Sequence, residues 1–160
     1  MKRKRALFAF GVLAGVAALA ACSHEQARLS LNANYGLFYN DQGETVALAY
    51  GLPNSDDVAL MLQCAKGSAR VELTDTARDT AATAIVLTAD GRRTSVPVRA
   101  EASEAGESKL LTGQLPLSAP ALQGFRKAGV IEVSSGRSRY AITVAQAQRP
   151  GVERFFRVCG

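Results

Sequence analysis

The chain has 160 residues, of which 48% are hydrophobic and 21% charged, and its formal net charge is +5. Four of its 19 basic residues stand at positions 2–5, so the rest of the chain holds 15 Lys and Arg against 14 Asp and Glu. Because this near-neutral remainder lacks the basic character of a nucleic-acid-binding domain, we exclude nucleic acid as a partner.

The first predicted element is an export signal over residues 1–21. Its basic residues (Lys2, Arg3, Lys4 and Arg5) precede an uncharged, apolar run over residues 6–18. A basic head before an apolar run too short for a membrane-spanning helix is typical of a signal peptide.

The signal ends in Leu19-Ala20-Ala21-Cys22, which is an aliphatic residue, two small residues and a cysteine. This sequence resembles the lipobox of bacterial lipoproteins. The resemblance implies cleavage before Cys22, a diacylglyceryl group on its sulfur and acylation of the new N-terminus, as by palmitate. Two or more acyl chains hold a protein stably on a membrane. The alternatives are an uncleaved N-terminal anchor and ordinary secretion after cleavage at residues 18–20.

Residues 22–27 are then a lipidated tether, which is short enough to keep the domain close to its membrane. In lipoprotein sorting, an aspartate after the lipidated cysteine favours the inner membrane. Through the same resemblance, Ser23 implies a place on the outer membrane, facing the periplasm.

Most of the remaining chain predicts strands, because apolar and polar side chains alternate with a period of two. In the strand that holds Val71, this residue is expected to face the core. The predicted strands are residues 28–33, 44–52, 58–64, 69–73, 81–88, 94–100, 109–117, 130–133 and 139–144.

Turn-forming residues separate these strands. Residues 53–57 (PNSDD), 65–68 (AKGS) and 134–138 (SSGRS) predict turns. Asp90-Gly91 predicts a tight hairpin, since both central residues of a primed turn need a positive φ. Residues 101–108 (EASEAGES) are acidic and small, and predict an exposed loop.

Two short helices complete the prediction. The first spans about 118–128, with Ser118 as its cap and Gly129 at its end. The second spans about 151–159, because four apolar residues follow the helical spacing i, i+3, i+4 and i+7. These residues are Val152, Phe155, Phe156 and Cys159. We therefore expect a single mainly β domain over 28–160, an antiparallel β-sandwich or barrel-like meander, with an α+β fold as the alternative.

The cysteines fit an exported protein. If Cys22 carries lipid, Cys64 and Cys159 remain as a pair in an oxidising compartment, where a disulfide is expected. Two buried free thiols are the alternative.

Catalytic residues are scarce. The one histidine, His24, lies in the tether, so no Ser-His-Asp or Cys-His set can form in the domain. Asp56 and Asp57 fit turn chemistry, and the glutamates spaced by three fit a solvated loop; these are Glu101, Glu104 and Glu107. We predict a protein that is not an enzyme and needs no cofactor, metal or small-molecule substrate.

Charge is unevenly placed, with seven basic and two acidic residues from position 120 onward. We hypothesise a basic surface that meets anionic headgroups or an acidic partner. Its candidate residues are Arg137, Arg139, Arg154 and Arg157. Arginines spread over different faces are the alternative.

Residues 135–140, Ser-Gly-Arg-Ser-Arg-Tyr, are similar to the Ser-Gly-x-x-Tyr loop with which lipid-anchored inhibitors of c-type lysozyme plug the enzyme cleft. They hold one residue more, and the chain lacks the tryptophan of that family's second motif. The resemblance implies that Ser135 and Tyr140 contact the enzyme, whereas a plain hairpin followed by a strand tyrosine also explains the segment.

Together these patterns favour a lipid-anchored cell-envelope protein with a noncatalytic interaction or structural domain. We expect its partners to be the membrane, through the N-terminal lipid, and another envelope protein. Inhibition of a lytic enzyme such as lysozyme is the alternative.

Overall fold

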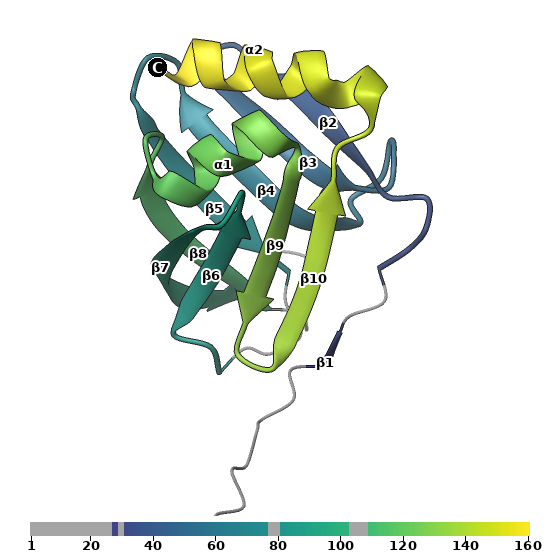
Figure 1. The fold of residues 1–160 in the computed structure, drawn as a ribbon, viewed down its shortest axis with the longest axis vertical. Coiled ribbons are helices and arrows are strands. Elements are labelled where there is room, and N and C mark those ends of the chain that lie inside the picture. The colour runs from purple at the N-terminus through teal and green to yellow at the C-terminus, as the bar shows by residue number, and fades with distance from the viewer. Residues whose placement is uncertain (1–26, 29–30, 77–80, 103–108) are drawn as a thin grey trace, which may run out of the picture.

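The computed structural model describes residues 27–28, 31–76, 81–102 and 109–160. The fold is mainly β, as expected: a strongly curled sheet forms a half-barrel, with two short helices packed on it (Figure 1). The strands are β1 (Ala27–Arg28), β2 (Gly36–Asp41), β3 (Thr45–Gly51), β4 (Val58–Ala65), β5 (Arg70–Asp75), β6 (Ala84–Ala89), β7 (Arg92–Ala102), β8 (Lys109–Pro116), β9 (Val130–Ser135) and β10 (Ser138–Thr143). The helices are α1 (Pro120–Ala128), the 3₁₀ turn η1 (Gln146–Gln148) and α2 (Arg149–Cys159).

The sheet has the strand order β1-β10-β9-β6-β7-β8-β5-β4-β3-β2. Neighbouring strands are antiparallel except for β1, which runs parallel to β10. Strands that follow one another in the chain make two meanders and one hairpin, as the turn residues predict. Two pairings between distant segments, β6 with β9 and β5 with β8, then join these pieces into one sheet.

Strand β7 lies in the middle of the sheet and belongs to both of its halves. Its residues 92–97 pair with β6, and its residues 98–102 pair with β8. At the change of partner, a Cβ on Gly113 would lie 2.6 Å from the carbonyl oxygen of Pro97, so only glycine permits this close approach. We call β1, β10, β9, β6 and residues 92–97 the hairpin half of the sheet. The rest of the sheet is the meander half.

Helix α1 packs on the hairpin half, where it buries Leu122 and Phe125. Gly129 ends the helix in the left-handed conformation with φ 71°, as predicted. Gly124 has a packing role that the sequence does not reveal. A Cβ at this position would lie 2.4 Å from the carbonyl oxygen of Ala89, so the glycine lets the helix approach the β6–β7 hairpin closely.

The helix predicted over about 118–128 is present, but its predicted cap is wrong. The helix begins at Pro120, and its N-cap, Ala119, makes no side-chain cap bond. Ser118 lies one residue before this N-cap, and the residue before it, Leu117, donates its N–H to the carbonyl of Ala69, just before β5. The hydroxyl of Thr94 on β7 accepts a hydrogen bond of 3.1 Å from the Ala121 N–H instead. A side chain from another element thus replaces the local cap.

Helix α2 confirms the helical spacing of its apolar residues. All four of them are buried, and the helix packs over β2 and β3 of the meander half (Figure 1). The hairpin at Asp90-Gly91 is also confirmed, with φ values of 48° and 69°. Val71 is fully buried, as expected.

The N-terminal strands differ from the prediction. Residues 31–35 are not a strand, because the Asn32 carbonyl and side chain accept hydrogen bonds from the N–H groups of Tyr35 and Asn34, which makes a turn. Residues 36–41, for which no element was predicted, form the edge strand β2. Its pairing with β3 compensates for the weak strand propensity of Asn40 and Asp41. The predicted loop at 101–108 begins inside β7, and residues 103–108 lie outside the described residues.

Candidate functional site

The N-terminal signal, the lipobox and His24 lie outside the described residues. The structure therefore neither supports nor contradicts their assignment. The first described segment after them is β1, which pairs with β10 beside Ser138 and Arg139.

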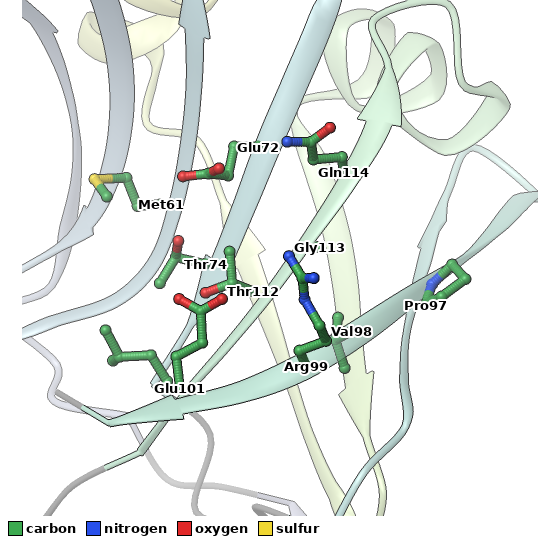
Figure 2. Close-up of a pocket in the computed structure, with 11 residues that line it drawn as sticks. Met61, Glu72, Thr74, Pro97, Val98, Arg99, Glu101, Thr112, Gly113 and Gln114 are labelled. Carbon is green, nitrogen blue, oxygen red and sulfur yellow. The ribbon is translucent and has the colours of Figure 1, made fainter.

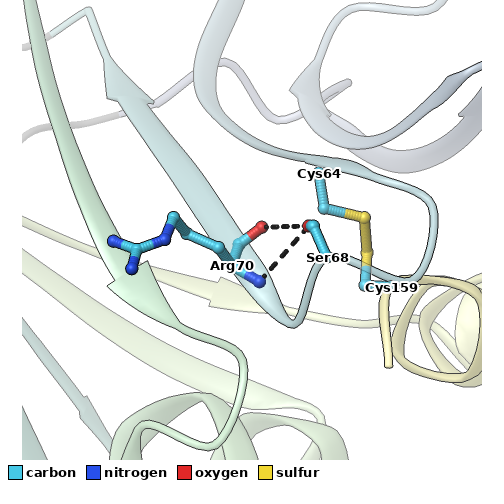
Figure 3. Close-up of a disulfide and its surroundings, with 4 residues drawn as sticks. All are labelled: Cys64, Ser68, Arg70 and Cys159. Carbon is cyan, nitrogen blue, oxygen red and sulfur yellow. Dashed lines mark hydrogen bonds between the residues drawn. A yellow bond between two sulfur atoms is a disulfide. The ribbon is translucent and has the colours of Figure 1, made fainter.

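Cys64 and Cys159 form the expected disulfide (Figure 3). It joins β4 to α2, with 5.9 Å between the two Cα atoms, and both residues are buried. The N–H groups of Gly67 and Ala69 bond the carbonyls of Val158 and Cys159 at 2.9 and 2.8 Å, so the β4–β5 turn holds the same helix end. The bridge consumes two of the three cysteines of the chain.

The four candidate arginines do not form one surface. Arg137 and Arg139 lie at the β9–β10 hairpin, and Arg154 and Arg157 lie on α2, which covers the opposite end of the domain (Figure 1). The hypothesis of a single basic C-terminal surface is therefore wrong for these residues. Charges that are close in the sequence are separated because the chain runs the full length of β10 between them.

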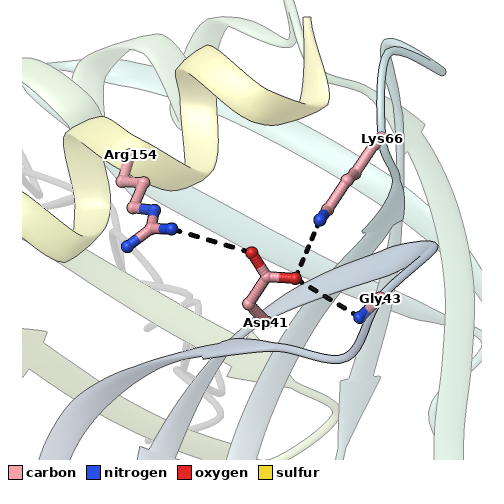
Figure 4. A network of polar contacts seen from close by, with 4 residues as sticks. All are labelled: Asp41, Gly43, Lys66 and Arg154. Carbon is pink, nitrogen blue, oxygen red and sulfur yellow. Dashed lines mark hydrogen bonds and ion pairs between the residues drawn. The ribbon is translucent and has the colours of Figure 1, made fainter.

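Arg139 and Arg154 have acidic partners among the described residues. Arg139 Nε lies 3.6 Å from Glu132 Oε1 on the neighbouring strand. Arg154 Nη2 lies 3.7 Å from Asp41 Oδ2, and its guanidinium stacks over the Tyr39 ring at 4.9 Å. The Lys66 ammonium binds the same carboxylate at 2.8 Å and lowers the pKa of Asp41 (Figure 4). The contacts of Arg154 with Asp41 and Tyr39 attach α2 to β2.

Tyr140 and Ser135 are not surface residues. Tyr140 is 5% exposed and Ser135 is 1% exposed, so neither is available as a contact residue of the type implied by the similarity to lysozyme inhibitors. The period-two alternation of β9 and β10 points both side chains into the core, and only Gly136 and Arg137 project at the turn. The assignment of Tyr140 as an interaction residue is therefore wrong.

Tyr140 instead belongs to a buried polar cluster that the sequence prediction missed. Its hydroxyl donates a hydrogen bond of 2.9 Å to Asp75 Oδ1, and Asp75 is 1% exposed. Burial raises the pKa of Asp75 to about 6, against the effect of the nearby Tyr140 and Ser135 hydroxyls. The Ser135 hydroxyl lies outside hydrogen-bond geometry, and Asp75 Oδ2 has no hydrogen-bond partner among the described residues. The alternation of Val71, Leu73 and Asp75 is the signal that could have revealed this burial.

A groove crosses the outer face of the meander half, opposite the core. Its larger part has a volume of about 580 Å³ (Figure 2). A neighbouring hollow of about 260 Å³ continues past the disulfide and shares Glu72 and Gln114 with the larger part. Because the side chains of this face alternate with those of the core, they are mainly polar. We call this surface the outer groove.

Side chains of neighbouring strands stand opposite one another in the outer groove. Thr112 of β8 pairs with Thr74 of β5 on one side and with Arg99 of β7 on the other. Glu72 pairs with Gln114 on β8, whereas Glu101 pairs with Leu110. The two glutamates are thus two strands and four residues of register apart, about 16 Å in a flat sheet. This separation is larger than that of the paired carboxylates of glycoside hydrolases.

The part of the chain that the structure describes contains no group of three or more His, Cys, Asp or Glu residues placed to hold a metal ion. No helix among these residues has the length and apolar character needed to cross a membrane. Comparisons with known protein families, with curated proteins and with solved structures find no match to this chain.

Proposed function

We propose that this protein is a lipid-anchored component of the bacterial cell envelope, whose noncatalytic domain binds another envelope component. The observation that supports it most is the disulfide. With Cys64 and Cys159 joined, Cys22 is the one cysteine of the chain outside the bridge, and it stands at the lipobox position.

The disulfide also supports an oxidising compartment. Disulfides persist in exported proteins and are rare in proteins of reducing compartments. The bridge therefore agrees with export by the N-terminal signal. In this proposal the domain faces the periplasm, and the sorting rule of the lipoproteins that the signal resembles supports an anchor on the outer membrane through Ser23.

Lipid attachment is testable by the intact mass of the full chain made in a bacterial host with a lipoprotein pathway. We expect a polypeptide that begins at Cys22 and carries a diacylglyceryl group and an N-terminal acyl chain. Cys22→Ser should remove the lipid mass and release the protein from the membrane fraction. A wild-type chain that begins at Met1, or that has an unmodified Cys22, would contradict the proposal.

The other two cysteines provide a matched control. The double variant Cys64→Ser/Cys159→Ser also loses thiols, but it retains the lipobox. It should therefore carry the same lipid mass as the wild-type protein. Loss of lipid from this variant would contradict the assignment of Cys22 as the lipidated residue.

The outer groove is the surface at which the proposed binding of an envelope component can be tested. A photoreactive residue at position 114, in the groove, should yield one discrete crosslinked product in intact cells, identified by mass spectrometry as an envelope component. The same residue at position 157, on α2, is the control and should not yield this product. An absence of discrete products from position 114 would contradict binding at the groove.

A further inference from the structure

We propose that the β9–β10 hairpin end of the domain lies against the phospholipid surface that holds the anchor, with Arg137 among the headgroup phosphates. Helices α1 and α2 then face away from the membrane. This inference rests on the proposed lipidation of Cys22, and it adds the orientation of the domain and its contact with lipid.

The direction of β1 determines from which end of the domain the chain enters the sheet. Ala27 pairs with Ser138 and Arg28 pairs with Arg139, in parallel orientation. Since β10 starts at the hairpin and runs toward the helices, the N-terminal end of β1 points to the hairpin end of the domain (Figure 1). The chain thus enters the sheet from that end.

The length of the tether limits the separation of the domain from the membrane. Ala27 is five residues after Cys22, and five fully extended residues span at most about 18 Å. The β1 end of the domain therefore cannot lie farther than this from the lipidated cysteine. Strand β10 has six residues, so the far end of the domain lies about 20 Å farther along the strand direction.

The hairpin turn provides a suitable contact for phosphate. Gly136 has a φ of 53°, while Arg137 has an ordinary negative φ, which is the pattern of a two-residue type II′ turn. This turn projects the exposed Arg137 beyond the ends of both strands. A guanidinium at this place can donate paired hydrogen bonds to phosphate oxygens. Arg139 is half-buried on β10, whereas Arg137 is exposed at the turn, so Arg137 is the basic residue that the hairpin presents closest to the lipid.

The absence of tryptophan from the chain makes the orientation measurable. Single tryptophans are introduced into the full lipidated protein by Arg137→Trp, Ala141→Trp, Thr143→Trp and Arg157→Trp. All four positions are exposed. Arg137 lies in the turn, Ala141 and Thr143 follow along β10 away from it, and Arg157 lies on α2. Each variant is reconstituted in phosphatidylglycerol vesicles that contain lipids brominated near the headgroup, and the quenching of tryptophan fluorescence is measured.

We expect the strongest quenching at position 137, less at 141 and 143, and the least at 157. Strongest quenching at 157, or equal quenching at all positions, would overturn the proposed orientation. Thermal unfolding of each variant verifies that it is folded. Similar quenching at positions 141 and 143 shows that neither substitution disturbs the structure locally.

A second comparison tests the role of charge. Adding Arg137→Gln to the Ala141→Trp protein should reduce its quenching in phosphatidylglycerol vesicles, whereas Arg157→Gln should leave the quenching unchanged. Equal effects of the two substitutions would overturn the phosphate contact. The intact mass of each sample separates the two proposals: a sample without lipid on Cys22 contradicts the proposed function, and a lipidated sample with position 157 at the membrane contradicts only the orientation.

Discussion

The hydroxyl of Tyr140 on β10 donates a hydrogen bond of 2.9 Å to the carboxylate of Asp75 on β5, inside the core of the domain. The bond joins the hairpin half of the sheet to the meander half across the space that the curled sheet encloses. A carboxylate placed there loses its hydration, and a single good donor compensates for only part of this loss. The cluster is therefore both a link between the two halves and a cost to stability at neutral pH.

The first prediction concerns the pH dependence that Asp75 creates. Its folded-state pKa of about 6 lies above the ordinary value of 3.8, so the folded protein binds the proton more tightly than the unfolded chain. The contribution of Asp75 to the free energy of unfolding is most favourable below pH 4. It falls as the pH rises to about 6 and is constant above that. A shift of this size corresponds to ~3 kcal/mol of unfolding free energy.

Asp75→Asn should remove this dependence. We expect the variant to gain about 2 kcal/mol of unfolding free energy at pH 8, because an amide is neutral and can still accept the Tyr140 hydrogen bond. Urea unfolding at pH 4.5 and pH 8 measures the gain, and the exposed Asp56→Asn is the control, with no comparable change. A loss of stability at pH 8 in Asp75→Asn would disprove the prediction.

The second prediction concerns the donor. Tyr140→Phe leaves the Asp75 carboxylate without its hydrogen bond, so it should destabilise the protein by about 1–3 kcal/mol at pH 8. The loss should be smaller at pH 4.5, where Asp75 is protonated. Tyr35→Phe is the matched control, because Tyr35 also donates to an aspartate, Asp57, but at an exposed site.

A double-variant cycle tests whether the two residues act together. In the Asp75→Asn background, Tyr140→Phe should cost less at pH 8 than it costs in the wild type. Equal costs in the two backgrounds would mean that the hydroxyl stabilises the fold through other contacts, such as the one of 3.5 Å to the Ala59 carbonyl.

The third prediction concerns the disulfide. The bridge closes a loop with a sequence separation of 95 residues. For a loop of this length, the entropy that the bridge removes from the unfolded chain corresponds to a stabilisation of about 4–5 kcal/mol. Cys64→Ser/Cys159→Ser should therefore lower the free energy of unfolding by several kcal/mol in chemical denaturation. Reduction of the wild-type bridge should have a similar effect. If the variant and the reduced protein unfold at the same denaturant concentration as the oxidised wild type, the bridge does not stabilise the fold.

The fourth prediction concerns Gly124 in α1. Helix propensity alone predicts that alanine would stabilise the helix by about 1 kcal/mol. We expect the opposite for Gly124→Ala, a loss of about 1–3 kcal/mol, because the new Cβ would lie 2.4 Å from a backbone oxygen of Ala89. Gly151→Ala in α2 is the control, since its Cβ would meet only the Tyr39 side chain, at 3.1 Å. A stabilised Gly124→Ala would contradict the packing seen here.

Local patterns in the amino-acid sequence predicted most of the individual elements. Period-two alternation placed Val71 in the core, Asp90-Gly91 marked a primed hairpin, and the spacing of Phe155 and Phe156 marked α2. The pairing of Cys64 with Cys159 followed from the count of cysteines. Each of these signals depends on neighbouring residues or on the chemistry of one residue type, and both are visible in a linear chain.

The remaining features arise from contacts between distant segments. The pairings of β5 with β8 and of β6 with β9 bring Asp75 and Tyr140 together, and the length of β10 separates Arg137 from Arg157. Strand β2, the Thr94 bond to the start of α1 and the space for Gly124 likewise depend on a neighbour supplied by another part of the chain. Propensity and periodicity report which face of an element is apolar, but the partner of that face is chosen by the packing of the whole core.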